Sequence, residues 1–189
     1  MIRRLLSRPV TWLVIAALGA GAAVGLFWFQ PWRLVTNTTV ADQLSAADSP
    51  ASVPAAAPSS ATPPAESPAG SSTKPVVVRE GTFVSHEHDT TGAARLVRKG
   101  DGTHQLELVG LDTSDGPDLR VWLTDQNAIT GTKAWSIFDD GRHVELGRLK
   151  GNRGNQVYPV PADVELDSYR SISIWCKRFS VSFGAALLQ

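Results

Sequence analysis

Cysteine is nearly absent from this sequence: Cys176 is the only one among 189 residues. A lone cysteine cannot form a disulfide bond within its own chain, so no disulfide framework can stabilise the fold. It also lies far from the N-terminus, so there is no cysteine that could be acylated as in a lipoprotein. This thiol is therefore left with packing, reactivity, ligation of a metal or cofactor, or an intermolecular disulfide.

An excess of charge of either sign is also lacking, because 18 basic residues are balanced by 18 acidic ones. Nucleic-acid-binding proteins usually carry a basic patch, and acidic tails need runs of carboxylates. The sequence shows neither, so no nucleic-acid partner is expected. No Ser-His-Asp set, carboxylate pair or Cys-x-x-Cys motif can be assembled, and whether the protein is an enzyme stays open.

Charge is missing altogether from residues 11–29. At ~1.5 Å per residue, a helix over this range is ~28 Å long, close to the ~30 Å hydrocarbon core of a bilayer. Three arginines precede the apolar run within the first eight residues, and one, Arg33, follows it. Since basic residues concentrate on the cytoplasmic side, the sequence predicts a cytoplasmic tail over 1–10 and one transmembrane helix over 11–29. The rest of the chain would then lie outside the cell membrane.

A cleaved signal peptide and the buried helix of a soluble protein are the alternatives for this segment. Ala20-Gly21-Ala22 has the small-residue pattern of a cleavage site. Against cleavage, the apolar run continues to Phe29, where a mature N-terminus would normally turn polar. The sequence therefore favours an uncleaved, single-pass anchor.

The segment that follows the apolar run is rich in Ala, Pro and Ser. Between residues 41 and 75 it has no aromatic residue and no apolar periodicity. Such a composition cannot bury enough surface to offset the entropy of ordering the chain. We therefore expect residues 30–75 to form a disordered stalk, whose Ala/Pro/Ser-rich part would span ~30–35 Å as a coil.

From residue 76 the composition changes to short strand-like runs separated by Gly, Asp and Asn turns. The runs are GTFVSHE (81–87), ARLVRKG (94–100), THQLELVG (103–110), DLRVWLT (118–124), HVELGRL (143–149), NQVYPVP (155–161), SISIW (171–175) and SVSFGAALL (180–188). The pattern predicts an all-β domain over 76–189, a single β-sandwich or small barrel of about eight antiparallel strands. Residues 125–142 read as a variable loop.

Three motifs in this region resemble the DM13 domain family. They are GPDLRVWL, LGRLKGNRGNQVYPVP and IWCKRFSVSFGAA, in this order, and the resemblance extends over residues 80–188. It implies an all-β domain outside the cytoplasm that takes part in electron transfer. In the family's proposed mechanism the equivalent of Cys176 is a redox thiol or the ligand of a prosthetic group such as haem. His88, also within the resemblance, is the candidate for a second ligand.

The position of Cys176 follows from strand alternation. Ile172, Ile174 and Cys176 share one face of a strand and Trp175 lies on the other, so the two isoleucines mark the core face. The cations of the next two residues, in CKR, could lower the pKa of the thiol and favour thiolate. Equally, Cys176 could be a small buried hydrophobic residue. Both interpretations stay open.

The remaining candidates lie on turns and at a strand end. His86 and His88 are two residues apart, so on a strand they could contact one metal ion, although exposed histidines explain the pair as well. Asp118 in GPDL, and Arg153, Asn155 and Gln156 in GNRGNQ, could line a binding rim. Ordinary turns account for the same residues.

Two functions from different classes therefore remain. In the first, a membrane-anchored domain transfers electrons through Cys176, with His88 as a second ligand and a haem or metal as cofactor. In the second, the domain binds a ligand or protein at the cell surface through the GNRGNQ loop, and Cys176 only packs. The sequence identifies neither the cofactor nor the redox or protein partner.

Overall fold

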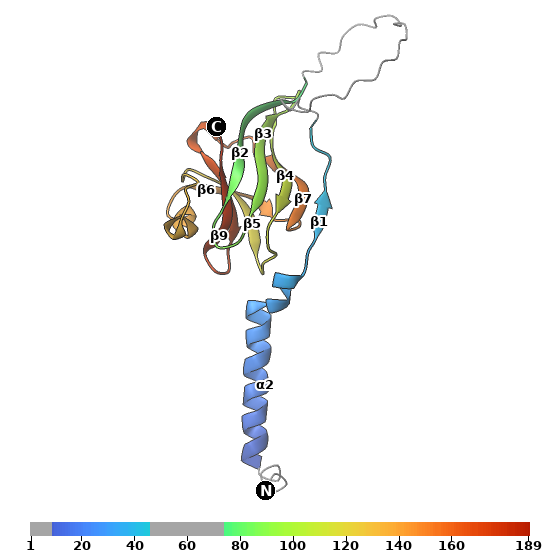
Figure 1. Cartoon of the computed structure of the whole chain (residues 1–189), viewed down its shortest axis with the longest axis vertical. Coiled ribbons are helices and arrows are strands. Elements are labelled where there is room, and N and C mark those ends of the chain that lie inside the picture. Colours follow the sequence, from blue (N-terminus) through green and yellow to red (C-terminus); the bar gives the residue numbers. More distant parts are fainter. Residues whose placement is uncertain (1–8, 46–73) are drawn as a thin grey trace, which may run out of the picture.

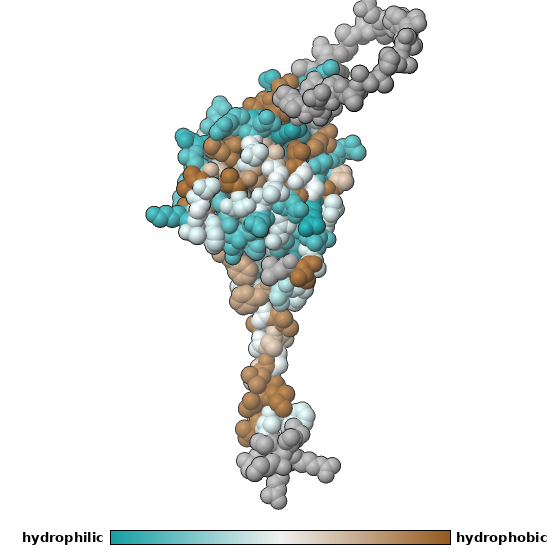
Figure 2. All heavy atoms as spheres, in the orientation of Figure 1, coloured by the Kyte–Doolittle hydropathy of each residue, from teal (hydrophilic) through white to brown (hydrophobic). Residues whose placement is uncertain are grey.

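The computed structural model of the chain describes residues 9–45 and 74–189, and it begins with a long helix. This helix, α2, runs from Pro9 to Phe29 and projects from the rest of the molecule (Figure 1). Its 21 residues correspond to about 31 Å of helix. None of its side chains is buried (Figure 2), which excludes the core helix of a soluble protein. The helix is long and apolar enough to cross a membrane, although a signal sequence would have the same properties.

The rest of the described chain is mostly β-structure in one curled sheet that resembles a half-barrel. The sheet has nine strands in the order β1-β7-β4-β3-β2-β9-β8-β5-β6. The strands are β1 (Thr39–Ala41), β2 (Val76–Ser85), β3 (Thr91–Arg98), β4 (His104–Asp112), β5 (Leu119–Thr124), β6 (His143–Arg148), β7 (Arg153–Val160), β8 (Ser171–Cys176) and β9 (Val181–Leu187). Strands β2 to β9 pair with one another only in antiparallel fashion, so the predicted all-β fold of about eight antiparallel strands is confirmed.

The curl arises at β2, which has different partners at its two ends. Val76–Thr82 pairs with β3, whereas Phe83–Ser85 pairs with β9. The sheet therefore bends along β2 and encloses one hydrophobic core on its inner face. Leucines, isoleucines and Phe183 from both halves of the sheet fill this core.

A second, smaller core covers the outer face of β5, β8 and β9. Trp122, Phe138, Trp175 and Ala185 form it. Phe138 comes from residues 125–142, where the 3-10 helices η2 (Thr132–Trp135) and η3 (Ile137–Asp139) lie. The predicted alternation in β8 is confirmed, because Ile172, Ile174 and Cys176 lie in the inner core and Trp175 in the outer one.

The structure differs from our expectation at the start of the predicted stalk, 30–75. Pro31–Val35 forms the 3-10 helix η1, and β1 pairs in parallel with the edge strand β7. The residues before the Ala/Pro/Ser-rich part are largely β-branched, and such residues favour strands. They are Val35, Thr36, Thr38, Thr39 and Val40. Residues 46–73 lie outside the described residues, as do residues 1–8 of the predicted tail, so disorder there stays a prediction.

The C-terminal end of α2 contacts the β domain directly. The guanidinium of Arg178 donates to the carbonyl oxygens of Trp28 at 2.7 Å and Phe27 at 3.4 Å. These carbonyls belong to the last turn of the helix, where no intrahelical donor remains and a cation is favourable. The rings of Phe29 and Phe179 stack at 5.9 Å. The domain therefore lies next to the helix end and not a stalk's length away.

Removal of the largest side chain in the outer core should be costly. Trp175 is 1% exposed, so we expect Trp175→Ala to lower the free energy of unfolding by about 3–5 kcal/mol. Val78→Ala, on the half-exposed part of β2, is the control and should change it by less than about 0.5 kcal/mol. Urea unfolding of both variants measures the difference. An equally small loss of unfolding free energy in both variants would mean that the outer core contributes little to stability.

Candidate functional site

Cys176 ends β8 with its side chain in the inner core, and none of its surface is exposed. Leu119 on β5 and Val181 on β9 are its neighbours across the sheet. Burial raises the pKa of the Cys176 thiol, although backbone N–H groups of Phe179 and Arg178 oppose this shift. The neutral thiol is therefore the favoured form at neutral pH.

The two cations beside Cys176 do not activate it, because both have other partners. The ammonium of Lys177 lies 3.6 Å from a carboxylate oxygen of Glu145. Arg178 contacts the end of α2, as described above. The charge that does act on the thiol is the carboxylate of Glu87, which further raises its pKa. The sequence motif CKR thus does not have the electrostatic effect that its composition indicates.

His88 lies near the same end of the domain, but it is held by other groups. Its ring contacts the ring of Phe183 with centroids 3.9 Å apart, and its Nε2 lies 3.7 Å from Glu87. A haem or metal ligand must present its donor atom to open space, whereas Cys176 is enclosed in the core. Within residues 9–45 and 74–189 there is also no group of three or more Cys, His, Asp and Glu that could hold a metal ion. This arrangement does not fit a haem or metal held by Cys176 and His88.

His86 is separated from His88 by the sheet. Its ring stacks on Phe138 of the outer core, whereas His88 contacts the inner core. The predicted shared face fails because β2 ends at Ser85, so the alternation does not reach either histidine. Nε2 of His86 donates to the carbonyl of Ile129 at 3.0 Å, and the Ser182 hydroxyl, 2.8 Å away, is then the donor to Nδ1. Both ring nitrogens are already used, which leaves none for a metal.

A cavity of about 280 Å³ lies where the end of α2 meets the domain. Phe29 from the helix and Phe179 and Phe183 from the domain give it aromatic walls. Its polar side chains are Gln30, Arg33, Glu87, His88 and Asp115. The cavity thus combines apolar surface with hydrogen-bonding groups of both signs, as small-molecule sites do. Its residues come from segments that lie far apart in the sequence.

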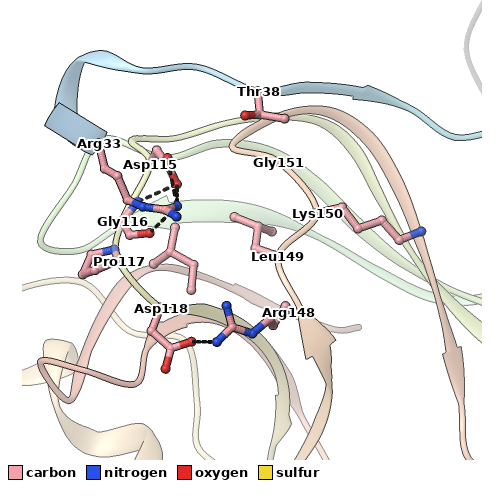
Figure 3. A pocket seen from close by; sticks show the side chains of 11 residues that line it. Arg33, Thr38, Asp115, Gly116, Pro117, Asp118, Arg148, Leu149, Lys150 and Gly151 are labelled. Atoms are coloured by element: carbon pink, nitrogen blue, oxygen red, sulfur yellow. Dashed lines mark hydrogen bonds and ion pairs between the residues drawn. The ribbon is translucent and has the colours of Figure 1, made fainter. Parts of the chain in front are cut away.

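The GPDL turn lines a second, polar cavity of about 90 Å³ (Figure 3). Arg33 reaches into it from η1 and lies 3.3 Å from Asp115. Asp118 binds Arg120 at 2.8 Å and Arg148 at 3.2 Å. Burial alone would raise the pKa of Asp118, but these two guanidiniums hold it below its usual value. Asp118 is therefore an ionised, already paired side chain.

The three GNRGNQ candidates also have partners within the domain. Arg153 pairs with Asp112 at 3.1 Å, and Asn155 accepts the Gly110 N–H at 2.8 Å. Gln156 is fully buried. Its amide donates to the Gly151 carbonyl and its oxygen accepts from the Tyr158 hydroxyl. These residues therefore shape the edge of the sheet and do not form a free rim.

Other residues that were not predicted as site residues lie on this edge. Asn37, Thr38 and Asp42 contact β7 and the loop before it, and Asn152 contacts two of them. The signal was available in the sequence, since TNTTV is a β-branched stretch without proline inside an expected stalk.

The burial of Cys176 has a direct chemical consequence. We expect the folded protein to resist iodoacetamide at pH 8, because the thiol is enclosed and its pKa is raised. The same thiol should react at the rate of a free cysteine in urea. Mass spectrometry of quenched samples measures the extent of alkylation. Rapid labelling of the folded protein at neutral pH would contradict the buried, neutral thiol.

Burial of His86 predicts a dependence of stability on pH. Burial lowers the pKa of His86 from its usual 6.5, although the hydrogen bond to Ile129 opposes this. The unfolded chain then binds more protons just below pH 6.5, so the free energy of unfolding should fall as the pH drops from 7.5 to 5.5. His86→Gln keeps a donor and an acceptor and should flatten this dependence. A wild-type stability that is constant over this range would contradict the assignment.

The chain has no significant match among curated proteins or among solved structures. Residues 82–188, more than half of the chain, match the family model described as Electron transfer DM13. The match begins at Thr82, within β2, and continues past the end of β9 at Leu187. The chain therefore belongs to the DM13 family.

Proposed function

We propose that this protein is a single-pass membrane protein that holds a DM13 electron-transfer domain at the outer face of the cell membrane. The observation that carries the proposal is the family match over residues 82–188, because the family is described by electron transfer. The fully exposed, apolar helix α2 supports the membrane part. The arginines before it support a cytoplasmic N-terminus.

Exposed aromatic residues beyond the candidate cleavage site support an uncleaved anchor. Phe27, Trp28 and Phe29 lie after Ala20-Gly21-Ala22, and all three contact the β domain. In a cleaved protein this apolar stretch would form an exposed N-terminus. In an anchored protein the same residues lie at the membrane boundary, where aromatic side chains are favoured.

The 280 Å³ cavity at the helix end supports a site for the electron carrier. Cys176 is not among the residues that line it, and the geometry does not favour a reactive thiolate there. A small organic carrier could instead contact the aromatic walls while His88 and Arg33 bind its polar groups. In this proposal Cys176 packs beside the site and is not the electron carrier.

A second candidate is a non-redox binding module at the cell surface. The complete burial of Cys176 favours it, because the only thiol of the sequence is enclosed and neutral. In this alternative the family resemblance would reflect the fold and not the chemistry.

Optical redox titration of the full-length protein, purified from its host membrane, separates the two candidates. The electron-transfer function predicts a spectral change with a defined midpoint potential. Cys176→Ala should keep this signal, whereas His88→Ala should shift or abolish it, because His88 lines the cavity and Cys176 does not. If only Cys176→Ala lost the signal, the thiol of Cys176 would be the group that transfers electrons. A protein without any signal would favour the non-redox module.

A further inference from the structure

The outer edge of β7 holds an extended segment of the same chain. Thr39, Val40 and Ala41 lie opposite Arg153, Gly154 and Asn155 in a parallel pairing. The backbone N–H of Arg153 donates to the Thr38 carbonyl at 3.2 Å, and the N–H of Asp42 donates to the Asn155 carbonyl at 3.0 Å. Addition of a strand to an exposed sheet edge is a common way to bind a peptide.

Two glycines of GNRGNQ make room for this segment. A Cβ atom on Gly151 would collide with the Thr38 carbonyl oxygen, and one on Gly154 with the Val40 carbonyl oxygen. Gly154 also has a φ of 94°, which other residues rarely adopt. The glycines are therefore needed for close approach of the segment as well as for the turn.

Polar side chains bind both ends of the segment. At its start, the buried Asn152 accepts the Thr38 N–H at 2.7 Å and donates to the Asn37 side chain at 2.8 Å. At its end, the Asp42 carboxylate accepts from the Lys150 ammonium at 2.5 Å and the Val157 N–H at 2.9 Å. Hydrogen bonding by Lys150 and Val157 lowers the pKa of Asp42. The site thus recognises an Asn side chain and a carboxylate five residues apart.

Binding at this edge involves little apolar burial. The side chains of Thr39 and Ala41 are exposed and Val40 is only half-buried. The segment is therefore held by backbone pairing and polar contacts. Elements with few buried apolar contacts open at a lower free energy than the core. The segment can consequently be released while the other eight strands stay folded.

We propose that the outer edge of β7 is a strand-binding site whose ligand is the chain's own Asn37–Asp42, and that its occupancy sets the reach of the domain. With the site occupied, the domain rests on the end of α2. On release, the length of chain between α2 and β2 limits how far the domain can move from the helix end, and a flexible chain of 46 residues would span about 35–40 Å on average. That the domain lies at a membrane depends on the proposed anchor, whereas the binding of Asn37–Asp42 to β7 does not.

Electron–electron distance measurements on the full chain test this proposal. Spin labels are placed at Trp32→Cys, on η1, and at Asp101→Cys, in the exposed turn after β3, while the buried Cys176 stays unlabelled. Wild type should show one narrow distance distribution. Gly151→Ala together with Gly154→Ala should make a broad distribution at longer distance the major population.

Gly102→Ala is the matched control for added backbone strain. Gly102 has a φ of 82°, but a Cβ there would meet nothing within 4 Å. This variant should therefore keep the narrow distribution. A narrow distribution in the Gly151→Ala, Gly154→Ala variant as well would overturn the proposal.

A synthetic peptide covering residues 36–45 keeps the test independent of folding in the variants. Added in excess to the doubly labelled wild-type chain, it should displace the segment and produce the broad distribution. The same peptide with Asn37→Ala and Asp42→Asn should compete much less. Equal competition by both peptides, or by neither, would contradict recognition by Asn152 and Lys150.

Two further measurements identify the source of the strand and separate this proposal from the anchor. A mixture of two singly labelled chains should give no narrow distance, and a narrow one would show that a second copy supplies the strand. The measurement is made in detergent micelles and in lipid nanodiscs. Because Trp32 lies after Ala20-Gly21-Ala22, a cleaved protein would still report strand binding. If the protein is found to be cleaved and the narrow distance is still present, the proposed anchor is contradicted and the strand-binding proposal is not.

Discussion

The change of partner along β2 is the constraint on which the rest of the domain depends. Because Val76–Thr82 pairs with β3 and Phe83–Ser85 with β9, a single sheet bends around one interior. The bend gives the sheet a concave face that can be closed by its own side chains. It also leaves a convex face over β5, β8 and β9, which Phe138 and the two short helices cover. Both cores of the domain therefore follow from one strand that belongs to two halves of the sheet.

The chemistry available to Cys176 follows from its place in this curl. The alternation that puts Ile172 and Ile174 inside also encloses the thiol. A neighbouring cation would offset the burial only if it faced the sulfur, and Lys177 and Arg178 face Glu145 and the helix end. The charges that a linear sequence places beside a thiol can therefore serve other interactions. The buried, neutral thiol is therefore poorly suited to thiolate chemistry.

Local pattern predicted the fold well and the site only in part. The strands and the inward parity of Cys176 follow from alternation and turn residues, which act over a few positions. His86 and His88 do not share a face, because β2 ends at Ser85 and its alternation does not reach them. The 280 Å³ cavity at the end of α2 combines residues from η1, the GPDL turn and β9. No sequence pattern specifies which distant loops meet. The same applies to β1, whose parallel pairing needs the edge of β7 in place.

The glycines of GNRGNQ connect the segment after α2 to the β domain. As turn residues they would need only permissive backbone angles, but Gly151 is not at a positive φ. Gly151 has no space for a Cβ atom, because the Thr38 carbonyl oxygen of the segment Asn37–Asp42 occupies it. An edge strand with unpaired backbone groups otherwise invites association with other chains. By pairing that edge with a segment that emerges from α2, the chain protects the edge and positions the domain with the same hydrogen bonds.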